Sequence, residues 1–406
     1  MPENIRLRIM LKMIKSGAHD RADYLLKTTP FTGPLSANRT LFLEGLIAKM
    51  RKQYDVAIKK FRTVLASDPK LTMVRAELAH TLFITEQDDS AKFQLKLLSG
   101  AAPTPELAKK FDRFIDAVDA RRPWKVSGYL SMAPSTNFTY GTTRRLTPGG
   151  GVIAGNSRKK SGIGITGGAN AGYTFKPGND LSVVVAAGVN FRDYKGETFD
   201  DLIVSQDVSV VRKHKSGQIA IGVTVSERKA GPTEFILEGG PYIAITQKIS
   251  NKVQFFIKLR HLRTDFKQSD YRNGSTTTID NRLTNAISQD SVFYLLSGAQ
   301  RTTTTLKHLN FWAAYGGIGL YKELPMGLSI YAEGKLTRRQ YDGDFFGLNE
   351  PQKDTKIDFV ASFTKRDFDI FGLAPRFDYI YSKSMSNSVF SEYSTHGANI
   401  TLTKAF

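Results

Sequence analysis

The chain has 406 residues, no cysteine and a formal net charge of +19 at pH 7. This length suits two or three domains, and the lack of cysteine excludes disulfides, thiolate metal ligands and a cysteine nucleophile. The positive charge is spread along the chain without a compact basic motif, so we expect no nucleic-acid partner. No run of about 18 apolar residues occurs, so we expect no transmembrane helix.

The first 120 residues carry the apolar periodicity of helices, as in the run Val56, Ala57, Phe61 and Leu65. Ala91 and Pro103 lie 34 residues after Ala57 and Pro69, and 34 residues is the period of tetratricopeptide repeats. The positions that match the small, aromatic and terminating residues of such a repeat are Gly45, Tyr54, Ala57, Phe61, Pro69, Ala91 and Pro103. We therefore predict a short all-α solenoid, with a plain helical bundle as the alternative.

A last helix is predicted over Pro105–Arg121, because Thr104 suits its N-cap and Pro105 its first turn. Helical periodicity then stops, and a strand-like alternation begins at Trp124. This change predicts two domains, a helical one over residues 1–123 and a β-domain over residues 124–406.

The second part alternates apolar and polar residues, which puts one kind of side chain on each face of a strand. The face that carries Glu333 and Lys335 is too polar for a dry core and suits a water-filled lumen. The number of candidate strands is fourteen, and an even number is expected for a single-chain outer-membrane barrel. We therefore predict a 14-stranded antiparallel transmembrane β-barrel. The fourteen candidate strands are 124–139, 161–175, 180–193, 199–213, 216–228, 232–248, 251–265, 275–289, 291–304, 308–322, 326–341, 354–366, 370–384 and 391–406.

The last strand ends in an aromatic residue, and its pattern resembles the signal that outer-membrane barrels present to their insertion machinery. The residues of this expected barrel-assembly signal are Gly397, Ile400, Leu402 and Phe406. Expected partners are therefore the barrel-assembly machinery and outer-membrane lipids. An ordinary edge strand of a soluble sheet is the alternative.

Charged residues on the predicted inner faces are candidates to line a path through the barrel. They are Lys258, Arg260, Glu333, Lys335, Arg339 and Arg376. Their cationic excess would attract an acidic segment of a client. The alternative is a purely structural ladder in which these side chains pair with wall carboxylates such as Asp358 and Asp378.

Nothing in the sequence points to catalysis. No serine motif surrounds any of the six histidines, and no His, Asp or Glu spacing matches a metal site. The glycine-rich stretch Thr147–Gly151 lacks the lysine and hydroxyl that end a phosphate loop. We expect no enzyme activity and no cofactor.

The order of these pieces resembles that of the surface lipoprotein assembly modulators, the Slam family. The resemblance rests on Gly45…Tyr54-x-x-Ala57…Pro69, on Trp124 leading into Ala133–Asn137, on Phe371-Gly372-Leu373-x-Pro375, on Ser386-Asn387-Ser388 and on the strand ending in Phe406. It implies an outer-membrane protein that moves a client from the periplasm to the cell surface or the medium. The implied client is a surface lipoprotein or a secreted haem-binding protein, received by a periplasmic helical domain.

Two expectations accompany this resemblance. The N-terminus lacks the apolar core of a signal peptide, so we expect a signal to have preceded Met1 in a precursor. A passive porin-like channel with a periplasmic binding domain is the alternative function, and a polysaccharide exporter ranks behind it. The sequence does not determine the client, its lipidation or whether it passes through the lumen or a lateral seam.

Overall fold

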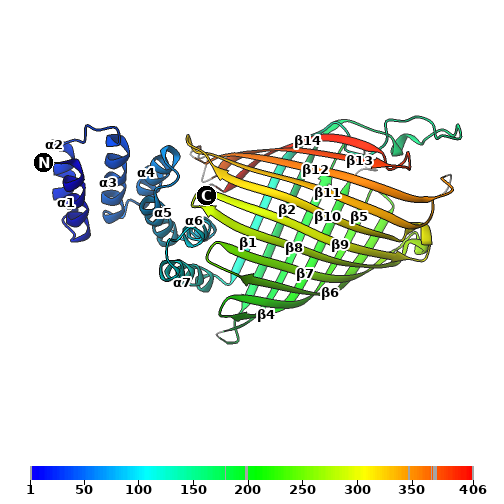
Figure 1. The fold of residues 1–406 in the computed structure, drawn as a ribbon, viewed down its shortest axis with the longest axis horizontal. Helices are drawn as coiled ribbons and strands as arrows, with labels where there is room; N and C mark the ends of the chain where they lie inside the picture. Colours follow the sequence, from blue (N-terminus) through cyan, green and yellow to red (C-terminus); the bar gives the residue numbers. More distant parts are fainter. Residues whose placement is uncertain are drawn as a thin grey trace.

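The computed structural model describes residues 2–178, 180–196, 200–345, 348–366, 368 and 373–404. Its first part is a row of antiparallel helices that leads to one end of a barrel (Figure 1). The helices are α1 (Glu3–Lys15), α2 (His19–Thr28), α3 (Ser36–Met50), α4 (Tyr54–Ser67), α5 (Thr72–Ile84), α6 (Asp88–Gly100) and α7 (Pro105–Arg121). The predicted helical solenoid is thereby confirmed.

The repeat residues pack helix against helix. Phe61 of α4 is fully buried, and a Cβ on Gly45 of α3 would lie 2.6 Å from its ring, so only glycine leaves room for this ring at that point. Ala57 and Ala91 are also fully buried, in α4 and α6. Small side chains there allow neighbouring helices to approach closely.

The remaining repeat positions lie at helix ends. Tyr54 begins α4, Pro69 is buried just after it, and Pro103 is exposed in the connection before α7. The Thr104 hydroxyl accepts a hydrogen bond from the Leu107 amide, as expected for an N-cap.

The second part is a closed antiparallel barrel in which each strand pairs with its neighbours in the sequence and β1 meets β14. All fourteen predicted strands are present. Their bounds are β1 (Trp124–Ser135), β2 (Gly162–Phe175), β3 (Leu181–Asp193), β4 (Asp201–His214), β5 (Gly217–Ala230), β6 (Glu234–Lys248), β7 (Val253–Phe266), β8 (Gly274–Ser288), β9 (Ser291–Thr304), β10 (Phe311–Glu323), β11 (Leu328–Asp344), β12 (Pro351–Lys365), β13 (Leu373–Ser386) and β14 (Tyr393–Lys404).

Strand alternation separates the two faces of the barrel wall. On β4, for example, the outward Val208 and Val210 are about half exposed, while Ser209 between them is buried. An apolar outer band around a closed sheet leaves no unpaired edge in lipid when closure is complete. This is the architecture of an outer-membrane barrel, as the sequence predicts.

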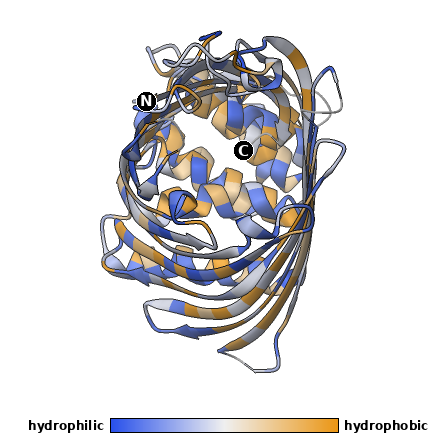
Figure 2. Cartoon of the chain, turned by 90° about the vertical axis from the view of Figure 1, so that its right-hand side faces the viewer, coloured by the Kyte–Doolittle hydropathy of each residue, from blue (hydrophilic) through white to orange (hydrophobic). Residues whose placement is uncertain are grey.

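The two ends of the barrel differ. One end of the barrel lies next to the helices, and we call it the helical end (Figure 1). It contains the start of β1 and the connections from even-numbered to odd-numbered strands. The longest loop, between β1 and β2, lies at the far end. Seen from the far end, the helices lie across the opposite opening of the lumen (Figure 2). The helical domain therefore stands in front of one mouth of the barrel.

Candidate functional site

A buried group of charges joins the helical domain to the barrel. The Glu323 carboxylate at the end of β10 lies 2.7 Å from Arg75 Nη2 of α5 and 2.9 Å from Arg366 Nη1, just after β12. The side chains of Arg75 and Glu323 are fully buried, and that of Arg366 is 8% exposed. We call these three residues the junction cluster. Because the Glu323 carboxylate lies between two guanidinium groups, opposite charges compensate for its burial.

Neighbouring polar groups satisfy the junction cluster further. Arg75 Nη2 donates to the carbonyl oxygen of Pro69 at 2.6 Å, and Arg75 also donates to the Gln94 side chain. On the barrel side, the Tyr321 hydroxyl donates to Glu323 at 3.2 Å. Pro69, which ends the first repeat, and Gln94 of α6 therefore help to position the Arg75 guanidinium against the barrel.

Further contacts surround the junction cluster. Lys248 pairs with Asp112 of α7 at 2.6 Å, and Phe93 of α6 packs edge-on against Tyr321 at 5.8 Å between ring centroids. A Cβ on Gly100, at the end of α6, would lie 2.5 Å from the Ala286 side chain of β8. The helical domain is thus packed closely against the rim, and not merely tethered to it.

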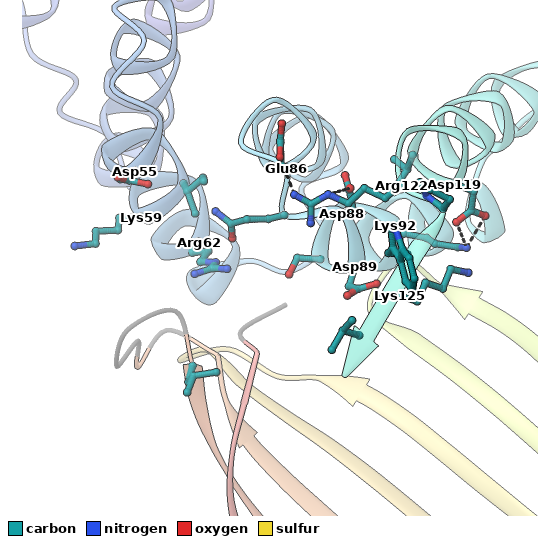
Figure 3. Close-up of a pocket in the computed structure, with 18 residues that line it drawn as sticks. Asp55, Lys59, Arg62, Glu86, Asp88, Asp89, Lys92, Asp119, Arg122 and Lys125 are labelled. Atoms are coloured by element: carbon teal, nitrogen blue, oxygen red, sulfur yellow. Dashed lines mark hydrogen bonds and ion pairs between the residues drawn. The ribbon is translucent and has the colours of Figure 1, made fainter. Parts of the chain in front are cut away.

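A cleft of about 1200 Å³ opens beside this contact, between the helices and the barrel wall (Figure 3). Residues of α4, the α5–α6 turn, α6 and α7 line its helical side. Trp124, Lys125 and Val126 at the start of β1, and Leu373 at the start of β13, line its barrel side. The cleft therefore lies where the helices, the first strand and the last hairpin meet.

Charges of both signs line the cleft, and many are paired. Arg122 lies 2.7 Å from Glu86 and 3.4 Å from Asp88, and Lys92 lies 2.6 Å from Asp119 (Figure 3). Although burial opposes ionisation of Asp119, the hydrogen bonds from Lys92 lower the pKa of its carboxyl group. These pairs link the α5–α6 turn and α6 to α7 and to the residue that follows it.

The junction of β1 and β14, which we call the seam, is paired over only part of its length. Within the described residues, β14 pairs with β1 at Ser131↔Thr401, Met132↔Ile400 and Ser135↔Gly397. By contrast, β13 pairs with β14 continuously from Leu373↔Lys404 to Ser384↔Tyr393.

Side chains strengthen the seam towards the far end. The hydroxyls of Ser131 and Thr401 are hydrogen-bonded, and the Thr136 amide donates to His396 O at 2.8 Å. The Asn137 side chain donates to Ser394 O at 3.1 Å. The predicted motif around Ala133–Asn137 therefore closes the seam at the far end, whereas no such contact joins the described residues at the helical end.

The predicted lumen residues lie on the inward face of the wall, opposite exposed apolar neighbours such as Leu259, Leu336 and Phe377. Four of the six form ion pairs with carboxylates of the same or the neighbouring strand. These ion pairs are Arg260–Asp280 (3.2 Å), Lys335–Asp358 (3.9 Å), Arg339–Asp354 (3.9 Å) and Arg376–Asp378 (2.7 Å).

The other two lumen residues contact tyrosines. Lys258 Nζ lies 3.9 Å from the centre of the Tyr242 ring, and Glu333 accepts a hydrogen bond from the Tyr331 hydroxyl. Cation–ring contacts of this kind stabilise a charge without neutralising it. The six side chains are therefore held along the wall, at several heights of the lumen, and are not gathered into one site.

The residues of the expected barrel-assembly signal lie at the seam. Gly397 and Ile400 pair with both β1 and β13, whereas Leu402 pairs with Pro375 of β13 alone. Phe406 and the Phe371–Gly372 part of the family-like motif lie outside the described residues.

Sequence reasoning missed the junction cluster and the cleft. The only local signal is an arginine, Arg75, within the apolar stripe of α5 that includes Val74 and Leu78. A buried arginine needs a partner, but Glu323 lies 248 residues away. Nothing in the sequence connects the two positions.

The described part of the chain holds no cluster of three or more His, Cys, Asp or Glu residues suited to a metal ion. None of its helices has the length and apolar character to cross a membrane.

Comparison with known proteins identifies the family. The family profile described as surface lipoprotein assembly modifier matches residues 124–406, and the profile for the N-terminal TPR repeats of the same family matches residues 37–95. Surface lipoprotein assembly modifier 1 of Neisseria meningitidis is 23% identical, over 90% of this chain and 75% of that protein. The Haemophilus influenzae protein of the same name is 19% identical, over 89% and 76%.

Solved barrels resemble the chain only loosely. The OmpF porin of Salmonella typhi aligns with 69% of this chain and 98% of its own, at 7% identity and a TM-score of 0.40, and a likeness this weak carries no functional information. The two profile matches cover the central helices, from α3 to most of α6, and the whole barrel. The chain therefore belongs to the surface lipoprotein assembly modifier family.

Proposed function

We propose that this chain moves a surface lipoprotein across the outer membrane. In this proposal residues 1–123 form a periplasmic domain that receives the client, and residues 124–406 form the barrel through which the client leaves. The observation that carries the proposal is the docking of the helical domain across one mouth of the barrel, with a cleft beside the seam. A client bound by the helices would be presented directly to the barrel.

The names of the relatives support a lipoprotein client. The alternative client is a soluble haem-binding protein. Such a client would be released into the medium and would not stay on the cell surface. The helical repeats offer a surface of the kind that solenoids use to bind polypeptides.

The first experiment is a comparison of surface lipoproteins in the native bacterium with and without this chain. Intact cells are treated with protease, and the released peptides are quantified by mass spectrometry alongside total lipoprotein. We expect one or a few lipoproteins to lose surface exposure while their total amount is unchanged, and re-expression of the chain to restore them. An unchanged surface and medium, together with steady open-channel conductance of the purified protein, would instead support a porin.

The lumen residues are proposed to contribute to the path. Reversal of charge at Lys258 and Lys335 to glutamate would replace weak attraction of an acidic client segment by repulsion. We expect reduced surface delivery at unchanged barrel assembly, measured by heat-modifiable migration in gels. Unchanged delivery would assign these residues to the structure of the wall.

A further inference from the structure

The first half of β1 is the longest run of the described wall that pairs with one neighbouring strand alone. Trp124–Leu130, which we call the edge segment, pairs with β2 from Trp124↔Tyr173 to Leu130↔Gly167. None of its residues pairs with the described part of β14. All seven residues are exposed, on both faces of the strand. Among the described residues, its second edge therefore has no backbone partner.

The unpaired stretch results from the course of β14. Continuing the register of Ser131↔Thr401 would place Leu402 opposite Leu130, yet this pair is not formed. Leu402 instead stays paired with Pro375 of β13. The end of β14 therefore follows β13 and diverges from β1.

The gap opens into the cleft. Trp124, Lys125 and Val126 of the edge segment line the cleft on one side, and Leu373 at the start of β13 lines it on the other. The helices that flank the cleft are α4, α6 and α7. A chain lying in the cleft would reach the free edge without crossing the barrel wall.

The side chains of the edge segment indicate which chain would fit. Trp124, Val126 and Leu130 are between 62% and 68% exposed on the outer face, whereas Lys125 and Ser127 lie on the alternate, inner face. Lys125 forms no hydrogen bond or ion pair with another described residue, although its charge helps to lower the pKa of the Asp119 carboxyl group in the same cleft. A matching strand would carry apolar residues outward, small or polar residues inward, and a carboxylate next to Lys125.

We propose that the edge segment is a docking site at which an extended segment of the client adds to the barrel as a strand. This inference rests on the proposed function. Strand addition supplies affinity through backbone hydrogen bonds and specificity through alternate side chains, and an exposed edge is a template for such pairing. The client segment recognised in this way is amphipathic with a period of two and carries an acidic residue on its polar face.

The first test uses a synthetic peptide and the full chain in liposomes. The peptide alternates valine and serine, with glutamate in place of one serine, and its control carries N-methyl groups on alternate backbone amides. Because the chain has no cysteine, a benzophenone can be attached at Ser127→Cys alone, or at Ser205→Cys on β4, which is paired on both sides. We expect about tenfold more capture of the peptide at position 127 than of the N-methylated peptide there, or of the peptide at position 205. A tenfold ratio corresponds to a difference in binding free energy of about 1.4 kcal/mol.

Charge exchange tests the acidic residue. Lys125→Glu should weaken capture of the glutamate peptide several-fold and restore capture of a peptide with lysine at the same place. Equal capture of both peptides by both proteins would overturn this part of the proposal.

Closing the gap tests the site in cells. A disulfide between Leu130→Cys and Leu402→Cys would hold β14 along the edge segment, whereas one between Met132→Cys and Ile165→Cys joins residues that are already paired across β1 and β2. We expect the first disulfide to abolish peptide capture and surface delivery, both recovering on reduction, and the second to leave both unchanged.

Other outcomes would overturn the proposal. Cross-linked dimers without peptide would assign the edge to a second copy, and a cross-link to residues 405–406 that peptide does not displace would assign it to the chain's own end. If surface delivery of lipoproteins requires the chain but continues when the Leu130→Cys/Leu402→Cys disulfide closes the gap, the docking site is refuted and the proposed function stands. Lipoproteins that do not depend on the chain would refute the function itself.

Discussion

The junction cluster and the seam both join segments far apart in the sequence, and they are stabilised in opposite ways. The junction cluster has a fully buried carboxylate between two arginines, whereas the seam has a few backbone pairs and hydroxyl contacts near one end. Charges buried in this way fix one docked arrangement, since any displacement leaves ions unpaired. Backbone pairs beside a gap can separate one by one. We therefore expect motion at the seam and not between the helices and the rim.

The largest expected effect comes from Glu323→Gln, which leaves the two arginines of the junction cluster without a carboxylate. Removing one partner of a buried pair costs about 3–5 kcal/mol, so the helical domain should undock. Thr72 and Gln289 are hydrogen-bonded across the same interface, and a cross-link between cysteines placed at the two positions would report docking. The partly exposed pair Lys248–Asp112 provides the control, because Lys248→Ala should cost about 1 kcal/mol or less. Full cross-linking in the Glu323 variant would show that the cluster does not hold the domain.

A second variant tests the close approach of α6 to the barrel. Gly100→Leu places a side chain where even a Cβ would lie 2.5 Å from Ala286, and overpacking typically costs about 1–3 kcal/mol. We expect a smaller loss of the same cross-link than Glu323→Gln produces. Gly178→Leu is the control, since nothing lies within 4 Å of a Cβ there. Equal cross-linking in both variants would mean that the contact is loose.

A pH-dependent contribution is expected from Asp290, whose carbonyl oxygen accepts from the Glu323 amide at 2.8 Å. Burial opposes ionisation of its carboxyl group, but hydrogen bonds from Lys322, Ser288 and Ser291 lower its pKa to about 2. Because the pKa is lower in the folded state than the usual value near 3.9, stabilisation of about 2 kcal/mol is present above about pH 4. It is lost as the pH falls towards 2.

Thermal unfolding of Asp290→Asn in detergent measures this contribution. The melting temperature should lie below that of the unaltered chain at pH 7, and the difference should shrink as the pH approaches 2. A difference that does not change with pH would mean that the hydrogen bonds, and not the charge, stabilise the turn.

The smallest effect is expected at the seam, from Ser131→Ala. It removes one hydroxyl contact to Thr401, worth about 1 kcal/mol. We expect faster hydrogen exchange at the backbone amides of β14 and little change in the melting temperature. Ser205→Ala, inside the paired wall, should leave exchange at β14 unchanged. Exchange that stays slow in Ser131→Ala would show that the seam is more stable than its pairing indicates.

Much of the fold follows from local patterns. Thr104 and Pro105 fix the start of α7, the 34-residue spacing from Ala57 to Ala91 fixes the repeat, and alternation fixes all fourteen strands. Each pattern operates within one element, where side-chain direction depends only on backbone period. The candidate lumen residues were also found in this way, because an inward position on a strand can be counted from its neighbours.

The sequence by itself therefore determined the elements, their order and the face on which each side chain lies. Only the tertiary structure decided that Arg75 meets Glu323, that a cleft forms beside Trp124, and that β14 follows β13 and leaves the edge segment of β1 unpaired. The physical reason is that these features depend on how a closed barrel and a docked helical row meet in space. Contacts between residues more than two hundred positions apart leave no periodic trace in either segment.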